Sequence, residues 1–160
     1  ARGAAGAAGV VPGGALSKRI KERKAEIMSK KYRDDGIIAL TPAADYTAKK
    51  GYLVTMAGDV ATLSASATTP AVGVIVETHE TAAGYASEKV SVAILGAVKG
   101  TVPMRCGGTI TKGELVKQNT DGTVIADGAG ARQVVGVALE SGEAGENIEV
   151  AARTPLYYAS

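Results

Sequence analysis

The feature that most constrains the fold is an internal repeat in the larger, C-terminal part of the sequence. Three blocks occur twice, in the same order. The pairs are GYLVTMAGDVATL with GELVKQNTDGTVI, PAVGVIVE with QVVGVALE, and EKVSVA with ENIEVA. We therefore predict two related β-units, over about residues 51–93 and 113–151, packed as one pseudo-symmetric domain. Residues 94–111 join the units, and the first part of this joining segment is compatible with a further strand.

Short runs of Val, Ile, Leu and Thr recur from residue 36 onward, separated by clusters of Gly, Asp and Ser. This spacing is typical of the strands of a small all-β barrel or sandwich. A hairpin turn is expected at Asn-Thr-Asp-Gly, residues 119–122. We predict a mainly β fold, a small β-barrel or sandwich over residues 36–160. The predicted strands are 36–40, 51–56, 71–77, 90–95, 113–117, 123–125, 134–139 and 148–151.

Two glycines, Gly73 and Gly136, occupy the same place in the repeat, each between valines. A glycine inside a strand marks a bulge, a bend or the close approach of another backbone. We expect both to bend the sheet rather than to bind a ligand.

The core must be built from small side chains, because the 160 residues include no Phe or Trp and six Tyr. Such a core buries less apolar area at each position. The 21 glycines add chain entropy that folding has to overcome. A partner that buries more surface would stabilise this domain, so we expect it to form oligomers.

Residues 1–35 differ from the rest in composition and charge. They contain nine Lys or Arg and four Asp or Glu, a net charge of +5, whereas residues 36–160 contain nine and twelve, a net charge of −3. Residues 1–15 are mostly Ala, Gly, Val and Pro and predict a flexible or extended arm. Residues 16–35 predict a basic helix with Ser17 as its candidate N-cap. Its thin apolar stripe indicates that the helix docks on a partner.

Catalytic candidates are few, and each has a simpler structural interpretation. His79 is the single histidine and stands beside Glu80, where a base assisted by a carboxylate would be possible, but we favour an exposed loop residue. Cys106 follows Arg105, which could lower the thiol pKa, but we favour a small, partly buried residue before a glycine turn. We predict no enzyme activity, no cofactor and no metal site.

The cysteine count, the lengths of the apolar runs and the make-up of the basic helix argue against disulfide-bonded, membrane-spanning and nucleic-acid-binding proteins. One cysteine allows no intramolecular disulfide. No apolar run reaches membrane-spanning length and the first residues do not resemble a signal peptide, so we expect a soluble protein folded in a cytoplasm-like compartment. Nucleic acid is a less favoured partner, because the basic helix has no interleaved aromatic residues and its Glu22 and Glu26 pair with lysines as on a solvated face.

The second unit resembles the small β-domain of capsid decoration (cement) and head-fibre proteins of tailed bacteriophages. The resemblance rests on Gly113-Glu114, Val116, Val124, the strand VGVALE (135–140) and the strand ENIEV (146–150). ILGAVKGTVPM (94–104) is similar to the connecting strand of that family. The likeness extends over about residues 36–153 and leaves out the arm and the basic helix.

This resemblance implies a non-enzymatic protein that binds the major capsid protein on the outer surface of the mature head and strengthens the shell. It would be made in the host cytoplasm and act as a homo-oligomer, with a trimer favoured. Residues 1–35 would order on binding and tether the β-domain. The alternatives are a head-fibre or other structural virion protein, a nucleic-acid-associated protein, and an enzyme built on His79 or Cys106. The predicted partner-binding residues are Arg2, Val10, Val11, Leu16, Lys18, Arg19, Ile20, Lys21, Arg23, Lys24, Ile27, Lys30, Lys31 and Arg33.

Overall fold

The structure is a computed structural model that describes residues 35–78 and 89–159. The described residues belong to one compact unit. The predicted arm (1–15), almost all of the predicted basic helix (16–35) and His79 lie outside the described residues. The predicted mainly β fold is confirmed, since the described elements are ten strands.

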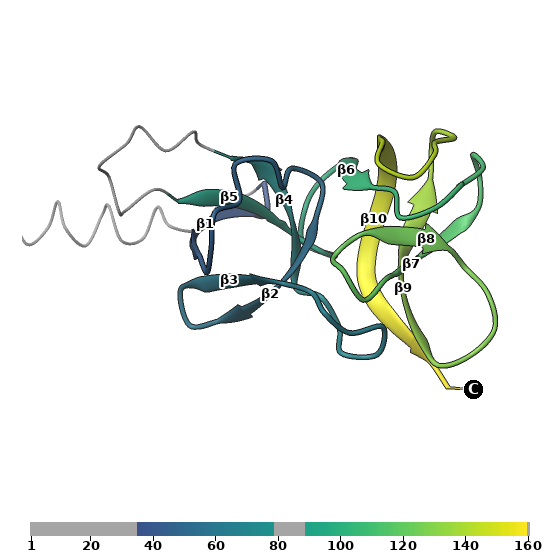
Figure 1. Ribbon diagram of the computed structural model, residues 1–160, viewed down its shortest axis with the longest axis horizontal. Helices are drawn as coiled ribbons and strands as arrows, with labels where there is room; N and C mark the ends of the chain where they lie inside the picture. Colours follow the sequence, from purple (N-terminus) through teal and green to yellow (C-terminus); the bar gives the residue numbers. More distant parts are fainter. Residues whose placement is uncertain (1–34, 79–88, 160) are drawn as a thin grey trace, which may run out of the picture. The chain divides into compact units, whose positions relative to one another are not determined.

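The first five strands form a closed barrel, drawn in blue to teal in Figure 1. Their order around the barrel is β1-β3-β2-β4-β5. The barrel closes because β1 pairs in parallel with β3 on one side and antiparallel with β5 on the other. The strands are β1 (Ile37–Pro42), β2 (Leu53–Ala57), β3 (Val60–Leu63), β4 (Gly73–Glu77) and β5 (Val90–Ile94).

The last five strands form a second sheet of the same topology, called the half-barrel here. Its order is β6-β10-β9-β7-β8. The closed barrel, followed from β1 in the direction of β5, has the corresponding order β1-β5-β4-β2-β3. The parallel pair that closes the barrel is reduced here to one parallel bridge, between Cys106 and Val124. The strands are β6 (Val102–Arg105), β7 (Leu115–Gln118), β8 (Val124–Ala126), β9 (Arg132–Ala138) and β10 (Asn147–Tyr158).

The two sheets make the prediction of a small barrel or sandwich built from two related units more specific, because one unit forms a closed barrel and the other a half-barrel. Each unit makes its own sheet, and the sheets lie side by side (Figure 1). The physical reason is local pairing: within each unit the antiparallel neighbours are β2–β3, β2–β4 and β4–β5, or β7–β8, β7–β9 and β9–β10. Strands that are close in sequence therefore pair with one another rather than with strands of the other unit.

The repeated glycines allow close packing between strands. A Cβ atom on Gly73 would lie 2.7 Å from the carbonyl oxygen of Ala93, and one on Gly136 would lie 2.5 Å from that of Ala151. Both distances are too short for real side chains. Both glycines therefore have a structural role in the close approach of a neighbouring strand. The expectation that they bend the sheet stays a prediction.

Small apolar side chains fill two core clusters, as the composition predicts. One cluster lies within the barrel and includes Val54, Ile75 and Val92. The larger cluster draws on both sheets, with Leu53 and Val74 from the barrel packed together with residues of the half-barrel such as Met104. The two sheets therefore share a hydrophobic core.

Hydrogen bonds join the two sheets around this shared core. The main-chain nitrogen of Leu53 donates to the carbonyl of Gly122 at 2.7 Å, and that of Arg105 donates to the carbonyl of Gly51 at 2.8 Å. The buried Gln118 side chain accepts a hydrogen bond from the main-chain nitrogen of Ala71 at 2.9 Å. Side-chain amides of the half-barrel thus satisfy the main chain of a barrel loop.

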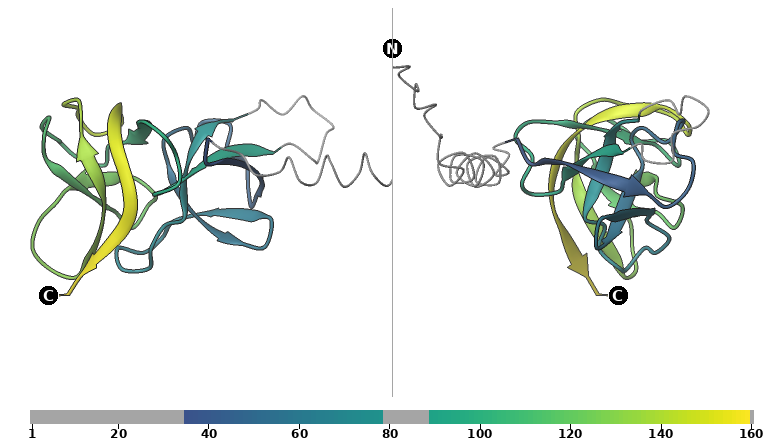
Figure 2. Two further views of the ribbon diagram at one scale, coloured as in Figure 1. Left: turned by 180° about the vertical axis from the view of Figure 1, so that it is seen from behind. Right: turned by 90° about the vertical axis from the view of Figure 1, so that its left-hand side faces the viewer.

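The strand β10 is the main departure from the predicted strand boundaries. It continues to Tyr158, beyond the predicted end at residue 151. Its register against β9 shifts between Ala152 and Leu156, and Figure 2 shows the strand (yellow) bending along its length. A bulge of this kind bends a strand and increases its twist.

Two other strands were not among the predicted runs. The strand β3 follows the turn at Gly58, and β6 begins at Val102, later than the joining segment suggested. The predicted hairpin at residues 119–122 is confirmed, since Gln118 pairs with Val124 across it. Gly122 in this turn has a φ of 80°, which glycine adopts without strain.

Candidate interaction surfaces

The cysteine that sequence analysis considered as a nucleophile is part of the core. Cys106 is 1% exposed and belongs to the core cluster shared by the two sheets. Burial raises the pKa of its thiol, the carboxylate of Glu146 raises this pKa further, and the opposing effect of Arg105 is smaller. A thiol held in its neutral form is a poor nucleophile, so the structure favours the packing role for Cys106.

The aspartates of the glycine-rich turns bind their own loops. The Oδ1 atom of Asp121 accepts a hydrogen bond from the main-chain nitrogen of Thr123 at 3.0 Å. Asp127 forms an ion pair of 2.5 Å with the Nε atom of Arg132. Within residues 35–78 and 89–159, no three His, Cys, Asp or Glu side chains are grouped so that they could hold a metal ion.

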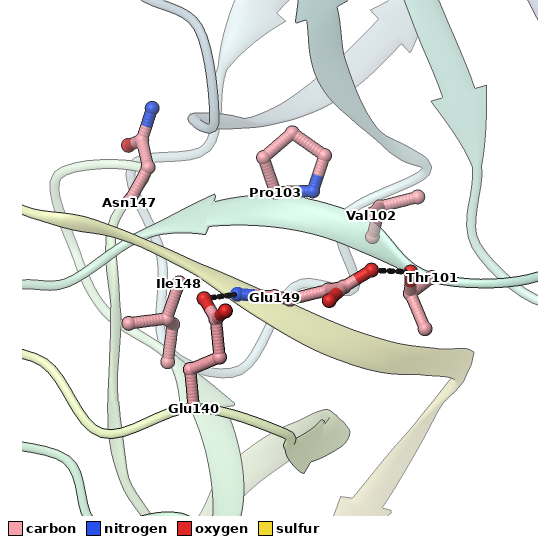
Figure 3. Close-up of a pocket in the computed structure, with 7 residues that line it drawn as sticks. All are labelled: Thr101, Val102, Pro103, Glu140, Asn147, Ile148 and Glu149. Atoms are coloured by element: carbon pink, nitrogen blue, oxygen red, sulfur yellow. Dashed lines mark hydrogen bonds between the residues drawn. The ribbon is translucent and has the colours of Figure 1, made fainter.

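A shallow pocket of about 260 Å³ lies beside β6 and β10. Figure 3 shows its two carboxylates engaged in contacts within the protein. The hydroxyl of Thr101 donates to the carboxylate of Glu149, and the main-chain nitrogen of Glu149 donates to the carboxylate of Glu140 at 3.1 Å. These contacts hold both carboxylates of the pocket within the protein. The lining residues are Thr101, Val102, Pro103, Glu140, Asn147, Ile148 and Glu149.

Four exposed glutamates, Glu140, Glu143, Glu146 and Glu149, give the loop before β10 and the start of β10 an acidic surface, and one basic side chain, Arg105, lies beside that loop at Gly145. Two of these carboxylates are also held locally: Glu143 accepts a hydrogen bond from the hydroxyl of Thr109 at 2.6 Å, and Glu146 accepts one from the main-chain nitrogen of Glu143 at 2.9 Å. An acidic surface of this kind repels a phosphate backbone and is compatible with a basic protein segment.

Exposed large apolar side chains lie at three places in the described unit, one of which is Leu115 on β7. Met56 and Val60 lie at the β2–β3 hairpin of the barrel, 43% and 38% exposed. Leu156 and Tyr157, on the C-terminal half of β10, are 48% and 52% exposed. Large apolar side chains in water mark a candidate contact surface when several lie together.

The sequence-based analysis missed the surface at Leu156 and Tyr157. The signal for it is the run TPLYYA at residues 154–159, which contains no Asp, Glu, Lys or Arg and includes two adjacent tyrosines. Tyrosine is a favourable strand residue, so this run extends the predicted last strand.

The partner-binding residues predicted from the sequence, from Arg2 to Arg33, all lie outside the described residues. The structure therefore neither brings them together nor separates them. Among the residues that the structure describes, no helix has the length and apolar character needed to cross a membrane.

Neither a protein-family model nor a curated protein matches this sequence. Among solved structures, the fold is similar to that of the head fiber gp8.5 N base in bacteriophage phi29, with a TM-score of 0.52. The sequences are 18% identical, and the match covers 76% of this chain and 98% of that chain. The predicted resemblance to phage head-fibre and decoration proteins is confirmed at the level of the fold.

Proposed function

We propose that this protein is a structural accessory protein of a tailed-bacteriophage head, and that it binds the outer surface of the mature capsid as a decoration protein. The observation that carries the proposal is the fold match to a head-fibre base over nearly the whole of that chain. The buried, neutral Cys106 supports a non-catalytic role, because it removes one of the two candidate nucleophile or base residues.

The proposed attachment uses the basic N-terminal segment as a tether to the major capsid protein. Residues 1–35 carry a net charge of +5, from nine Lys or Arg and four Asp or Glu. An extended segment can cover a large surface, and a second contact through the β-domain would add to the affinity of the first. The acidic surface from Glu140 to Glu149 disfavours attachment of the half-barrel to nucleic acid.

Binding to purified, expanded phage heads that lack this protein tests both parts of the proposal. We expect the full chain to bind saturably and to raise the temperature at which the heads release DNA. A variant lacking residues 1–34 should keep its β-type circular dichroism and bind at least about tenfold more weakly, because it loses one of two linked contacts.

A matched variant separates charge from length in the same assay. Replacing the eight Lys and Arg between residues 18 and 33 by Gln keeps the length of the segment and removes its positive charge. This variant should also bind weakly if the tether is electrostatic. Undiminished binding by the truncated chain would remove the tether, whereas no binding by the full chain would overturn the capsid role itself.

A base for a head fibre is the second candidate function, and the identity of the structural neighbour favours it. A decoration protein covers the shell in many copies, whereas a fibre base supports a further projecting chain. Cryo-electron microscopy of the native particle distinguishes the two by the number of copies and by density extending beyond the β-domain.

A further inference from the structure

The junction between the two sheets joins unlike ends of the two repeat units. The barrel contributes the start of β2, where the main-chain nitrogen of Leu53 donates to the carbonyl of Gly122 at 2.7 Å. The half-barrel contributes the turn between β7 and β8, which contains Gly122. A contact between unlike ends is head-to-tail, so each unit keeps one end that this junction does not use.

The unused end of the half-barrel is the counterpart of the buried end of the barrel. Leu115 stands in the repeat where Leu53 stands, and it pairs with β9 as Leu53 pairs with β4. The carbonyl of Leu115 accepts a hydrogen bond from the main-chain nitrogen of Asp127 at 2.8 Å. The carbonyl of Leu53 accepts the equivalent bond from Ser64 at 2.9 Å. Leu115 therefore has the same position in its sheet as Leu53.

Leu115 lacks the cover that Leu53 has. Its side chain is 38% exposed, whereas Leu53 is 0% exposed. In the described part of the chain, no carbonyl accepts from the main-chain nitrogen of Leu115, although the equivalent nitrogen of Leu53 is bonded to Gly122. In stacks of repeats, terminal units need a polar outer face, and here a leucine stands on that face. This end of the half-barrel is therefore open to a further contact.

A second part of the barrel end has the same kind of counterpart. The barrel loop between β3 and β4 packs on the half-barrel, where the carbonyl of Ala67 accepts from the main-chain nitrogen of Gln133 at 3.1 Å. The corresponding loop between β8 and β9 starts beside Leu115, and its residues 128–130 are all exposed. These are Gly, Ala and Gly, which allow another main chain to approach closely. Leu115 and residues 128–130 are together called the free end here.

The filled junction shows what kind of group covers such an end. A Cβ on Gly122 would lie 3.1 Å from the carbonyl oxygen of Leu53 and 3.3 Å from the ring of Tyr52, so a larger residue would be crowded there. Gly122 also has a φ of 80°, which residues with a side chain rarely adopt. A hairpin turn with glycine at the point of contact therefore fits this type of end.

A second copy of this chain does not offer such a turn. Its turn at residues 119–122 is already used in the junction between its own sheets. The turn between β2 and β3 is shorter, because Ala57 pairs directly with Val60. Val60 also stands in the repeat where Gly122 stands, so a branched side chain would take the place of the glycine. The turn that fits the free end must therefore come from another protein.

We propose that the free end of the half-barrel binds a β-hairpin turn of another protein, in the way that Leu53 binds the turn at residues 119–122. The partner is a β-domain whose turn presents a glycine carbonyl to the main-chain nitrogen of Leu115. Shape selects this partner more than charge does, since Glu114 and Lys117 bring both signs to this end of β7. The proposal depends neither on the capsid role nor on the basic tether.

A cyclic hairpin peptide is the probe for this site. It has the sequence of residues 116–126, closed by a disulfide between two added terminal cysteines. Added to the ¹⁵N-labelled full chain, it should shift the amide signals of residues 113–115 and 128–130 saturably, with a Kd of about 1 mM or lower. The same peptide with Gly122→Val is the matched control and should bind at least about tenfold more weakly, because it carries the valine of the barrel turn.

Variants of the full chain locate the contact. Leu115→Lys should also weaken binding of the peptide at least about tenfold, since it removes the apolar side chain at the centre of the free end. Met56→Lys changes a similarly exposed side chain on β2 and should leave binding unchanged. Shifts that do not saturate, that lie away from the free end, or that Leu115→Lys leaves intact would overturn the proposal. So would a mass in light scattering that rises with concentration and is restored to that of the monomer by Leu115→Lys, because the occupant would then be a second copy.

Discussion

At the residue scale, the side chain of Gln118 satisfies three main-chain groups of a barrel loop. Its Oε1 atom accepts from the nitrogen of Ala71, and its Nε2 atom donates to the carbonyls of Ser66 and Thr69. The side chain is fully buried, so no water replaces these bonds when it is removed. The sequence carries little sign of this role, since Gln118 stands beside Asn119 at the start of a predicted polar turn.

Gln118→Leu should therefore lower the free energy of unfolding by about 3 kcal/mol, because it leaves a buried N–H and two carbonyls unpaired. Gln133→Leu is the matched comparison: Gln133 is 5% exposed, but its side chain donates one hydrogen bond, to the carbonyl of Thr68. We expect a smaller loss there, about 1 kcal/mol. Urea denaturation followed by circular dichroism measures both, and equal losses would contradict the special role of Gln118.

At the element scale, the repeated glycines Gly73 and Gly136 should be equally intolerant of alanine. Each replacement places a Cβ atom against the main chain of the neighbouring strand, at Ala93 or Ala151. We expect each to cost about 1–3 kcal/mol, as overpacking in a rigid core does. Gly108→Ala is the control, since its Cβ would meet nothing nearer than 3.8 Å. The midpoint of thermal unfolding measures all three, and a drop for Gly108→Ala alone would refute this account.

The elements also show which part of the fold can be predicted from sequence. The repeat and the Val-rich runs located eight of the strands, because alternating apolar residues and glycine turns are local signals. The remaining strands, β3 and β6, are short and depend on their neighbours: β3 is placed by its pairing with β1 and β2, and β6 by its pairing with β10. Among the described strands, the pairing of β10 with β6 ends at Val150, and this boundary is equally non-local because it depends on where β6 lies.

At the scale of the whole molecule, the division into two sheets follows from pairing that a sequence repeat does not specify. The repeat indicates two similar units, but it is equally compatible with one shared barrel and with two neighbouring sheets. Hydrogen bonds such as Leu53 to Gly122, and a core cluster containing residues of both sheets, decide how the units are joined. The predicted partner-binding residues, by contrast, depend on a partner and stay a prediction.

The shared core has a consequence for unfolding that separates one cooperative unit from two independent ones. Leu53 and Val74 of the barrel pack in the same cluster as Met104 and Val150 of the half-barrel, so neither sheet can open without exposing apolar surface of the other. We expect residues 35–160 to unfold in a single thermal transition in the full chain, with equal calorimetric and van't Hoff enthalpies. Gln118→Leu should shift this transition to lower temperature without splitting it, because the core still joins the sheets. Two separated transitions in the wild-type protein would show instead that each unit is stable alone and that the contact between the sheets contributes little to folding.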